Sequence, residues 1–251
     1  MRIKVELGSE KKVVLPVAYN HIIQGFIYGA LSNELAEFLH EKGYVLNDRH
    51  FKLFTFSRVF GRYRVYKGSI VFDPPVYFYL SSPFVDILEE LVNTIFTGSN
   101  PLQFGKNNLL CTAVSVLKEP FFERGSYIIK MLSPMTVYRT EDLRGKKRTY
   151  YYGPQEKEFS ERIEENLKRK YMLITKSDNL PSRMGFVIEP FKVDIRHDFI
   201  LTYFKDTIVK GWMGLYRITG NRELIRVAYD TGLGSKNSAG FGMWELTRGS
   251  E

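Results

Sequence analysis

The chain has 251 residues and a formal net charge of +8 at pH 7, with 36 Lys and Arg against 28 Asp and Glu. Its content of 44% hydrophobic and 15% aromatic residues excludes an intrinsically disordered protein. No apolar run approaches the roughly 20 residues that cross a bilayer, and no signal-peptide pattern opens the sequence, so we expect a cytoplasmic protein without a membrane partner. The single cysteine, Cys111, excludes an internal disulfide and a cysteine-based zinc site, and its apolar neighbours predict a buried structural thiol.

The positive charge is concentrated in the C-terminal half. Residues 1–120 hold 13 Lys and Arg against 11 Asp and Glu, whereas residues 121–251 hold 23 against 17. An excess of cations together with many aromatic rings is typical of proteins that bind nucleic acids, because cations neutralise phosphates and rings stack on bases. The same composition also fits an ordinary basic surface that keeps a protein in solution.

The N-terminal half alternates between patterns typical of strands and patterns typical of helices. Period-two alternation and aromatic runs predict the strands, and apolar residues at helical spacing predict the helices. In chain order we expect a strand at Arg2–Leu7, a helix from Asn20, strands at Phe51–Ser57, Ser69–Phe72 and Val76–Leu80, a helix at Phe84–Phe96, and a strand at Leu109–Lys118. This order is that of a ferredoxin-like fold.

The first predicted helix needs a break. If it continued unbroken, Tyr28 and His40 would lie about 18 Å apart along its axis and about a third of a turn out of phase. Ser32 is a good N-cap and Gly43 a good C-terminal stop, so we predict a second helix that starts at Asn33. Such a break folds His40 back towards Tyr28, and a continuous helix would rule out a shared site.

A domain boundary is expected at Glu119–Ser126, where proline and glycine flank an aromatic pair. The chain then divides into residues 1–120 and residues 121–251. The second half repeats the first pattern less clearly. Its expected elements are extended segments at Tyr127–Val137 and Arg148–Tyr152, a charged helix at Glu156–Tyr171, strands at Met184–Ile195 and Ile208–Gly220, a short helix at Glu223–Tyr229, and a last strand at Phe241–Leu246.

Residues 232–242 read Gly-Leu-Gly-Ser-Lys-Asn-Ser-Ala-Gly-Phe-Gly and hold two Gly-x-Gly pairs around a lysine. Glycine permits positive φ and a close approach to the backbone, and free N–H groups beside a cation suit a phosphate. The spacing matches neither the P-loop nor the dinucleotide-binding motif, which disfavours ATP and NAD. From composition alone, a simple turn is an equally good interpretation.

This segment resembles the C-terminal glycine-rich loop of the CRISPR-associated repeat-cleaving endoribonucleases of Cas family six, in the RAMP superfamily. The N-terminal part resembles the same family at Tyr19-Asn20-His21, at Gln24–Tyr28 and in residues 38–41 and 52–57. The resemblance spans essentially the whole chain. It implies an α+β fold of two tandem ferredoxin-like (RRM-like) domains with antiparallel sheets. It also implies metal-independent cleavage of CRISPR repeat RNA, which releases guide RNAs and needs no cofactor.

Three residues match positions that commonly serve catalysis in the family, namely Tyr28, His40 and Lys52. Together they could cleave RNA through attack of a ribose 2′-OH on the adjacent phosphorus, giving a 2′,3′-cyclic phosphate and a 5′-OH. Histidine suits the proton transfers, lysine supplies fixed charge, and tyrosine can donate a hydrogen bond. Each also has an ordinary interpretation as a surface or boundary residue. His50 is a rival for the catalytic histidine, because it is closer to Lys52 in sequence.

For RNA binding, the resemblance points to the glycine-rich loop, and a basic run with aromatic neighbours adds a second candidate. The loop residues are Gly232, Gly234, Ser235, Lys236, Asn237, Gly240 and Gly242, and the basic run comprises Arg144, Lys146, Lys147 and Arg148, followed by Tyr150–Tyr152. A solvated basic hairpin explains the second set equally well. We expect no metal site, because no His, Asp and Glu set has ligand spacing.

The alternative function is a non-catalytic protein or scaffold subunit that binds CRISPR repeat RNA. The glycine-rich loop and the positive charge fit both functions, and only Tyr28, His40 and Lys52 distinguish between them. CRISPR repeat RNA is the expected partner in either case. Other CRISPR effector subunits and a second copy of the chain are further candidate partners.

Overall fold

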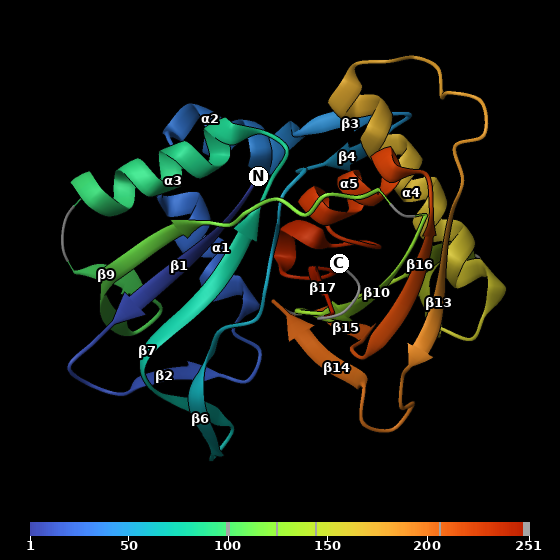
Figure 1. The fold of residues 1–251 in the computed structure, drawn as a ribbon. Coiled ribbons are helices and arrows are strands. Elements are labelled where there is room, and N and C mark those ends of the chain that lie inside the picture. The colour runs from blue at the N-terminus through green and yellow to red at the C-terminus, as the bar shows by residue number, and fades with distance from the viewer. Residues whose placement is uncertain (99–100, 124, 144, 206, 248–251) are drawn as a thin grey trace.

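The computed structural model describes residues 1–98, 101–123, 125–143, 145–205 and 207–247. Two antiparallel sheets form side by side, and helices cover one face of each (Figure 1). Each sheet has its own hydrophobic core. The strands of the first sheet end at Val116 and those of the second begin at Ser126. The predicted boundary at residue 120 lies between them and stays a prediction.

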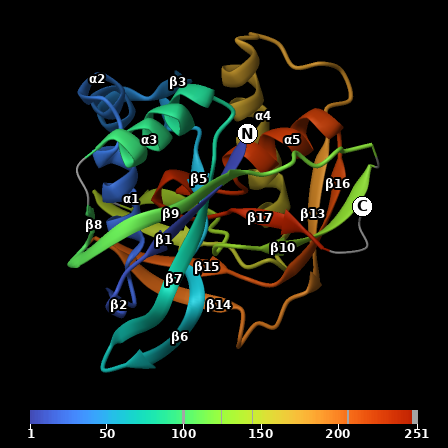
Figure 2. The same cartoon turned by 60° about the vertical axis from the view of Figure 1, so that its left-hand side comes forward.

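The first domain follows the predicted order of elements. Its elements are β1 (Arg2–Gly8), β2 (Val13–Pro16), α1 (Asn20–Gly29), α2 (Asn33–Glu37), a π-helical turn η1 (Phe38–Lys42), β3 (Tyr44–Leu46), β4 (Arg49–Phe51), β5 (Thr55–Phe56), β6 (Phe60–Tyr66), β7 (Ser69–Ser81), α3 (Val85–Thr97), β8 (Leu102–Phe104) and β9 (Asn107–Val116). The central order is β9, β1, β7, with β5 and β6 on the far edge of β7. This is the 4-1-3-2 order of a ferredoxin-like sheet. In two views the β6–β7 hairpin extends away from the rest of the domain (Figures 1 and 2).

The second domain repeats this topology. Its elements are β10 (Ser126–Met131), β11 (Tyr138–Leu143), β12 (Lys146–Tyr151), α4 (Lys157–Thr175), β13 (Phe186–Lys192), β14 (Phe199–Phe204), β15 (Thr207–Trp212), β16 (Leu215–Gly220), α5 (Arg222–Thr231), a 3₁₀ turn η2 (Asn237–Ala239) and β17 (Trp244–Leu246). The sheet order is β17, β10, β16, β13. Numbered within the βαββαβ unit, this is the same 4-1-3-2 order as in the first domain. The hairpins β11–β12 and β14–β15 are additions to that unit. The predicted tandem ferredoxin-like fold is confirmed.

Two of the predicted strands are broken in the structure. The strand expected at Phe51–Ser57 is interrupted because Leu53 has a φ of +52° and both Leu53 and Phe54 are buried, so the side chains do not alternate between two faces. The strand expected at Ile208–Gly220 is two strands in different sheets, β15 and β16. They are separated at Gly214, which has a φ of +102°.

Two further expectations are corrected on β7 and β9. The strands expected at Ser69–Phe72 and Val76–Leu80 are parts of one long strand, β7. Cys111 is half-buried instead of buried. Leu110 and Val116, on the same strand, are 52% and 66% exposed, because one face of β9 points away from the core. The apolar run therefore predicted the strand correctly but not the burial of its side chains.

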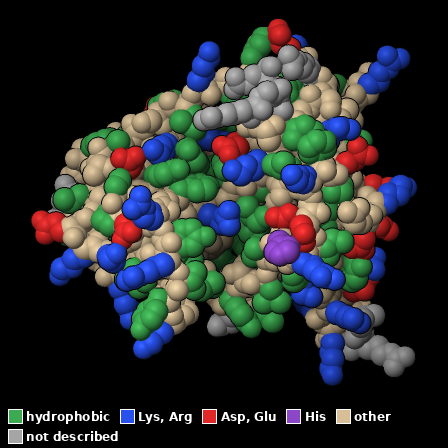
Figure 3. Space-filling model, turned by 60° about the horizontal axis from the view of Figure 1, so that its bottom comes forward, with side chains coloured by type: hydrophobic (Ala, Val, Ile, Leu, Met, Phe, Trp, Pro, Cys, Tyr) green, Lys and Arg blue, Asp and Glu red, His purple; other side chains and the backbone are tan. Residues whose placement is uncertain are grey.

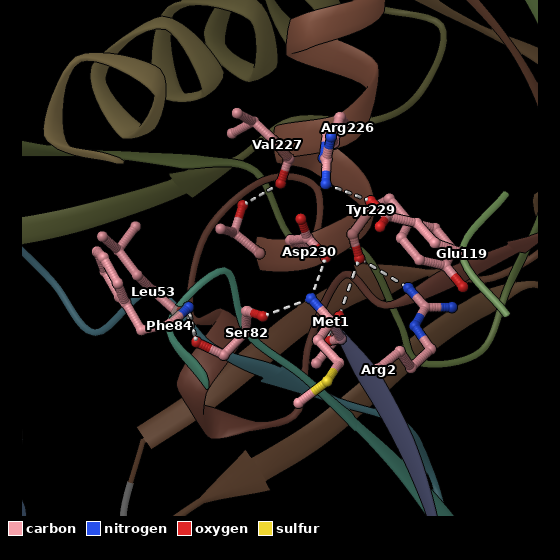
Figure 4. A network of polar contacts seen from close by, with 12 residues as sticks. Met1, Arg2, Leu53, Ser82, Phe84, Glu119, Arg226, Val227, Tyr229 and Asp230 are labelled. Carbon is pink, nitrogen blue, oxygen red and sulfur yellow. Dashed lines mark hydrogen bonds and ion pairs between the residues drawn. The ribbon is translucent and has the colours of Figure 1, made fainter. Parts of the chain in front are cut away.

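The two domains meet at the start of β1. The guanidinium of Arg2 is buried, lies 3.7 Å from the centre of the Tyr229 ring, and donates to the backbone oxygens of Tyr229 and Trp244, both at 2.7 Å. The amino group of Met1 donates to the Ser82 oxygen at 2.8 Å and to a carboxylate oxygen of Asp230 at 3.0 Å (Figure 4). The contacts of Arg2 and Met1 thus tie the first strand to the last helix and last strand.

Candidate functional site

The predicted helix break is present and brings the candidate catalytic residues together. Helix α1 ends at Gly29, and the hydroxyl of Ser32 caps α2 by accepting from the Leu35 amide at 3.4 Å. Glu90 of α3 also accepts from the Ser32 amide at 2.7 Å, which holds the break against the domain. The second helical segment stops at Gly43, which has a φ of +61°. The predictions for Ser32 and Gly43 are both confirmed.

Tyr28, His40 and Lys52 form one cluster. The Tyr28 and His40 ring centres lie 6.3 Å apart, with the ring planes at 88° to one another. The ammonium group of Lys52 donates to the backbone oxygen of His40 at 3.0 Å. His40 is exposed, as expected, whereas Tyr28 is half-buried beside Phe54. A phenol, an imidazole and an ammonium group therefore share one small region of the first domain.

Burial separates the roles that these groups can take. Desolvation raises the pKa of Tyr28 to about 12, so near neutral pH its hydroxyl keeps its proton, can donate a hydrogen bond and does not act as a base. Desolvation lowers the pKa of Lys52. The imidazole of His40 makes no hydrogen bond within the described part of the chain. It is therefore free to exchange protons with a bound molecule.

The rival histidine, His50, is two positions before Lys52 and lines the same cavity as Lys52. Its Nδ1 is 2.7 Å from the Lys42 carbonyl oxygen. Because a carbonyl only accepts, Nδ1 carries the proton in neutral His50 and Nε2 is left as an acceptor. His50 lines a cavity together with Lys52, whereas His40 contacts Tyr28. Which histidine is catalytic stays a prediction.

This cavity lies between the domains and has a volume of about 430 Å³. Its first-domain wall is the segment from β4 to Phe54, and its second-domain wall is formed by α4, the start of β11 and the glycine-rich loop. The hairpin β3–β4 crosses the boundary and packs beside α4 (Figure 1). The basic and aromatic lining residues are Arg49, His50, Phe51, Lys52, Phe54, Tyr138, Lys170 and Lys236. No Asp or Glu is among the described residues that line it.

The glycines of the loop are required by the protein's own packing. Gly232, Gly234, Gly240 and Gly242 all have φ between +69° and +82°. A Cβ on Gly242 would lie 2.0 Å from the Leu233 oxygen, and a Cβ on Gly240 would lie 2.4 Å from the Phe56 ring. Here the groups that approach the glycines closely are backbone and side-chain atoms of the protein itself. Contact between these glycines and RNA stays a prediction.

Lys170 and Asn237 hold the glycine-rich loop from within the second domain. The amide nitrogen of Asn237 donates to the oxygens of Leu233 and Phe241, both at 3.0 Å. The buried ammonium of Lys170 donates to the Asn237 side-chain oxygen at 2.7 Å and to the Gly232 oxygen at 2.8 Å. Desolvation lowers the pKa of Lys170 to about 7. Asn237 is thus occupied with bracing the loop around Lys236.

Lys170 was not selected from the sequence, although a signal for it was present. It continues the buried stripe of α4, whose other buried members are Phe159, Ile163 and Leu167. A lysine on such a stripe must have its charge satisfied inside the protein. The hydrogen bonds from Lys170 to the loop provide the partners for this charge.

The first domain holds the same loop from the other side. Helix α1 contributes Asn20, which donates to the Ala239 and Gly240 oxygens at 2.9 and 3.1 Å, and Gln24, which donates to the Ser238 oxygen at 2.8 Å. Because α1 also carries Tyr28, one helix joins the glycine-rich loop to the candidate catalytic cluster. The loop is therefore a link between the two domains.

The basic run of the second domain lies apart from the cavity. Lys146, Lys147 and Arg148 are exposed on β12, and none of them lines the cavity. Arg144 lies outside the described residues. Tyr138, on the paired strand β11, does line the cavity. The hairpin β11–β12 thus reaches the cavity through its aromatic residue, and RNA contact by its cations stays a prediction.

A second basic and aromatic surface lies on the β6–β7 hairpin. All residues of the run Arg62-Tyr63-Arg64-Val65-Tyr66-Lys67 are exposed. Lys and Arg side chains are spread over the face that carries the ends of the hairpins, around a hollow between the two halves (Figure 3). The alternation of cations and aromatic rings in this run was a signal for such a surface, and it was not selected from the sequence.

The described residues contain no group of three or more His, Cys, Asp and Glu side chains placed to hold a metal ion. They also contain no helix that is long and apolar enough to span a membrane.

Comparisons with known proteins converge on one family. The family model "CRISPR-associated protein Cas6, N-terminal" matches residues 14–112, and the model "CRISPR associated protein Cas6, C-terminal" matches residues 117–246. A protein of Pyrococcus furiosus named "CRISPR-associated endoribonuclease Cas6" is 32% identical and aligns over 97% of this chain and 89% of its own length. The "CRISPR-associated endoribonuclease Cas6 1" of Methanocaldococcus jannaschii is also 32% identical, over 97% of this chain and 91% of its own.

A solved structure supports the same assignment. The structure titled "CRISPR associated protein Cas6" is 26% identical, superposes with a TM-score of 0.79 and covers 99% of both chains. The likeness thus extends over both ferredoxin-like domains and over the segments that carry the candidate site. On these matches and this fold, the chain belongs to the Cas6 family of CRISPR-associated proteins.

Proposed function

We propose that this protein is a metal-independent endoribonuclease that cleaves CRISPR repeat RNA and so releases guide RNAs. The observation that carries the proposal is the convergence of Tyr28, His40 and Lys52, beside a cavity whose described lining holds no carboxylate. The names of the curated relatives support the same activity. The activity would be exercised in the cytoplasm.

The proposed reaction is an internal transesterification. His40 takes the proton of the 2′-OH, the 2′-oxygen forms a bond to the adjacent phosphorus, and the bond from phosphorus to the 5′-oxygen breaks. The proton is then returned to the departing 5′-oxygen, so the products are a 2′,3′-cyclic phosphate and a 5′-OH. Tyr28 donates a hydrogen bond and Lys52 offsets the negative charge that grows on the phosphoryl oxygens.

The RNA is held, in this proposal, by the loop and by the basic surfaces. We assign RNA contact to the loop residues and the basic run named from the sequence: Gly232, Gly234, Ser235, Lys236, Asn237, Gly240, Gly242, Arg144, Lys146, Lys147 and Arg148. Lys236 is the strongest of these, because it lines the cavity and its ammonium lies 5.5 Å from the centre of the Tyr138 ring. Contacts with other CRISPR effector subunits, or with a second copy, remain predictions.

The test is a cleavage assay with end-labelled CRISPR repeat RNA, run with and without EDTA. We expect cleavage at one position, unaffected by EDTA, with a 2′,3′-cyclic phosphate on the upstream fragment. Inhibition by EDTA, reversed by a divalent cation, would contradict metal independence. Tight binding without cleavage would favour the alternative, a non-catalytic RNA-binding protein or scaffold subunit.

A further inference from the structure

The cavity between the domains gathers positive charge without a matching negative charge. Arg49 comes from β4, Lys52 from the segment after it, Lys170 from α4 and Lys236 from the glycine-rich loop. Within the described part of the chain, none of these four cations makes an ion pair with a carboxylate. Their charges repel one another in a concave site from which water is partly excluded.

Burial makes this arrangement costly for the protein alone. Desolvation is the largest cause that lowers the pKa of Lys52 and of Lys236. Lys170 is buried and is satisfied only by neutral groups of the loop. Like charges that are held together in a concave, partly dehydrated site attract anions strongly. The cavity is therefore arranged for an anionic group.

The geometry sets Arg49 and Lys236 on opposite walls. Tyr138 is near both: the Lys236 ammonium lies over its ring, and the charge of Arg49 opposes the rise that burial causes in the pKa of the Tyr138 hydroxyl. Arg49 is exposed and therefore accessible to a ligand. The volume of about 430 Å³ falls in the range of small-molecule sites, roughly 300–1,000 Å³.

Lys52 connects this cavity to the candidate catalytic cluster. It lines the cavity, and its ammonium also touches the backbone of His40. A phosphate in the cavity is therefore close to one that is cleaved beside His40 and Tyr28. An RNA strand offers such closely spaced phosphates, because each nucleotide carries one.

We propose that the cavity binds the RNA phosphate adjacent to the cleaved one, with Arg49 and Lys236 as its direct ligands. Lys170 holds the loop, and with it Lys236, in place through its hydrogen bond to Asn237. The inference rests on the proposed function and adds to it a subsite that both domains must form. It also assigns a role to Arg49.

The test measures binding of a repeat RNA that is made non-cleavable by a 2′-deoxy sugar upstream of the cut. Fluorescence anisotropy gives Kd over a range of NaCl concentrations for wild type and for the double variant Arg49→Met/Lys236→Met. For single-stranded RNA, the slope of log K against log salt falls by about 0.7 for each phosphate that the protein no longer neutralises. Since both residues bind one phosphate, we expect the slope to fall by about 0.7 and Kd to weaken.

The matched control is Lys176→Met/Arg222→Met, which removes the same two charges. Lys176 has a φ of +53° and Lys236 one of +58°, so both lysine substitutions place methionine in a left-handed position. Neither Lys176 nor Arg222 lines the cavity. The control should bind with nearly the wild-type slope. The conservative variant Lys236→Arg should retain affinity, which distinguishes removal of the charge from disruption of the loop.

Three results would overturn the inference, and only the third would also overturn the proposed function. If the cavity variant matches the control in Kd and slope while wild type still cleaves, the subsite is wrong and the proposed function stands. A fall in slope near 1.4 means two independent phosphates and contradicts a shared one. If wild type neither binds nor cleaves repeat RNA, the proposed function and this inference both fail.

Discussion

At the scale of single residues, burial assigns different tasks to neighbouring polar groups. Tyr28 has a pKa near 12 because its hydroxyl is desolvated, so it is a donor and not a base at neutral pH. That leaves the proton transfers to a histidine. His40 faces Tyr28, whereas His50 has its Nδ1 fixed by the Lys42 carbonyl and lines the cavity with Lys52. The contact with the Tyr28 ring favours His40.

The two histidines can be compared by one pair of variants. We expect His40→Ala to slow single-turnover cleavage by about 10²–10⁴-fold, the usual contribution of a general base, with little change in Kd for RNA. His50→Ala should slow cleavage much less. Single-turnover rates with labelled repeat RNA give both numbers. A large effect of His50→Ala combined with normal cleavage by His40→Ala would transfer the catalytic role to His50.

At the scale of elements, the turn after the second helical segment sets where Lys52 lies. Gly43 has a φ of +61°, and a Cβ there would lie 2.4 Å from the Phe51 oxygen and 3.0 Å from the Lys52 side chain. The end of η1, the strand β4 and the Lys52 side chain therefore meet at a point where only glycine fits. A shift of this backbone moves Lys52 relative to His40.

Substitution of Gly43 should damage catalysis more than binding. We expect Gly43→Ala to destabilise the protein by about 1–3 kcal/mol and to lower kcat more than RNA affinity, because the misplaced group is Lys52. Gly68→Ala is the control, since Gly68 also has a positive φ of +73° but its Cβ would meet nothing within 4 Å. Chemical denaturation and cleavage kinetics test both. Equal effects of the two substitutions on kcat would refute the steric explanation.

The contact between α4 and the glycine-rich loop makes a prediction about stability and pH. Lys170 has a pKa of about 7 when folded and about 10.5 when unfolded, so the unfolded chain binds more protons between these values. Wild type should therefore gain stability relative to Lys170→Met as pH rises from about 7 to 10.5, by at most about 1.4 kcal/mol per pH unit. Denaturant unfolding at several pH values measures this difference.

The control for that measurement is Lys168→Met, on the same helix. Lys168 pairs with Glu164 at the surface instead of reaching the loop. The difference in free energy of unfolding between wild type and Lys168→Met should not rise over the same pH range. If the difference in free energy of unfolding between wild type and Lys170→Met is also independent of pH, the Lys170 ammonium keeps its proton in the folded protein. That result would contradict the low pKa.

At the scale of the whole molecule, the candidate site depends on how the two domains are held together. Arg2 and Met1 tie β1 to the second domain, and Asn20 and Gln24 of α1 hold the glycine-rich loop. These contacts hold the glycine-rich loop against the first domain, where Lys236 and Lys52 line the same cavity. Neither domain alone contains all of its walls.

The sequence predicted most of the fold because its signals are local. Helical spacing, the cap at Ser32 and the stop at Gly43 depend on neighbouring residues, and the structure confirms them. The interruption at Leu53 was missed, because burial of two consecutive side chains is decided by tertiary packing. The separation of β15 from β16 was missed for a similar reason, since each strand takes partners that are distant in the sequence.

The candidate site was predictable in part. Tyr28, His40 and Lys52 come from one stretch of chain, so the helix break was enough to bring them together. Arg49 and Lys170 were missed, because their shared cavity joins the first domain to α4, more than a hundred positions away. The resemblance pointed to the glycine-rich loop as an RNA-binding segment, which stays a prediction. The structure adds that Gly232 and Gly240 pack against Thr55 and Phe56 of the first domain.

The central claim is that the RNA's own 2′-OH is the nucleophile, and one substitution in the substrate tests it. The cut is first mapped with unmodified repeat RNA, and a 2′-deoxy sugar is then placed at the nucleotide just upstream of it. We predict that this RNA binds with unchanged Kd and is not cleaved, even at long times and high enzyme concentration. Efficient cleavage of the 2′-deoxy RNA at the same position would contradict the account.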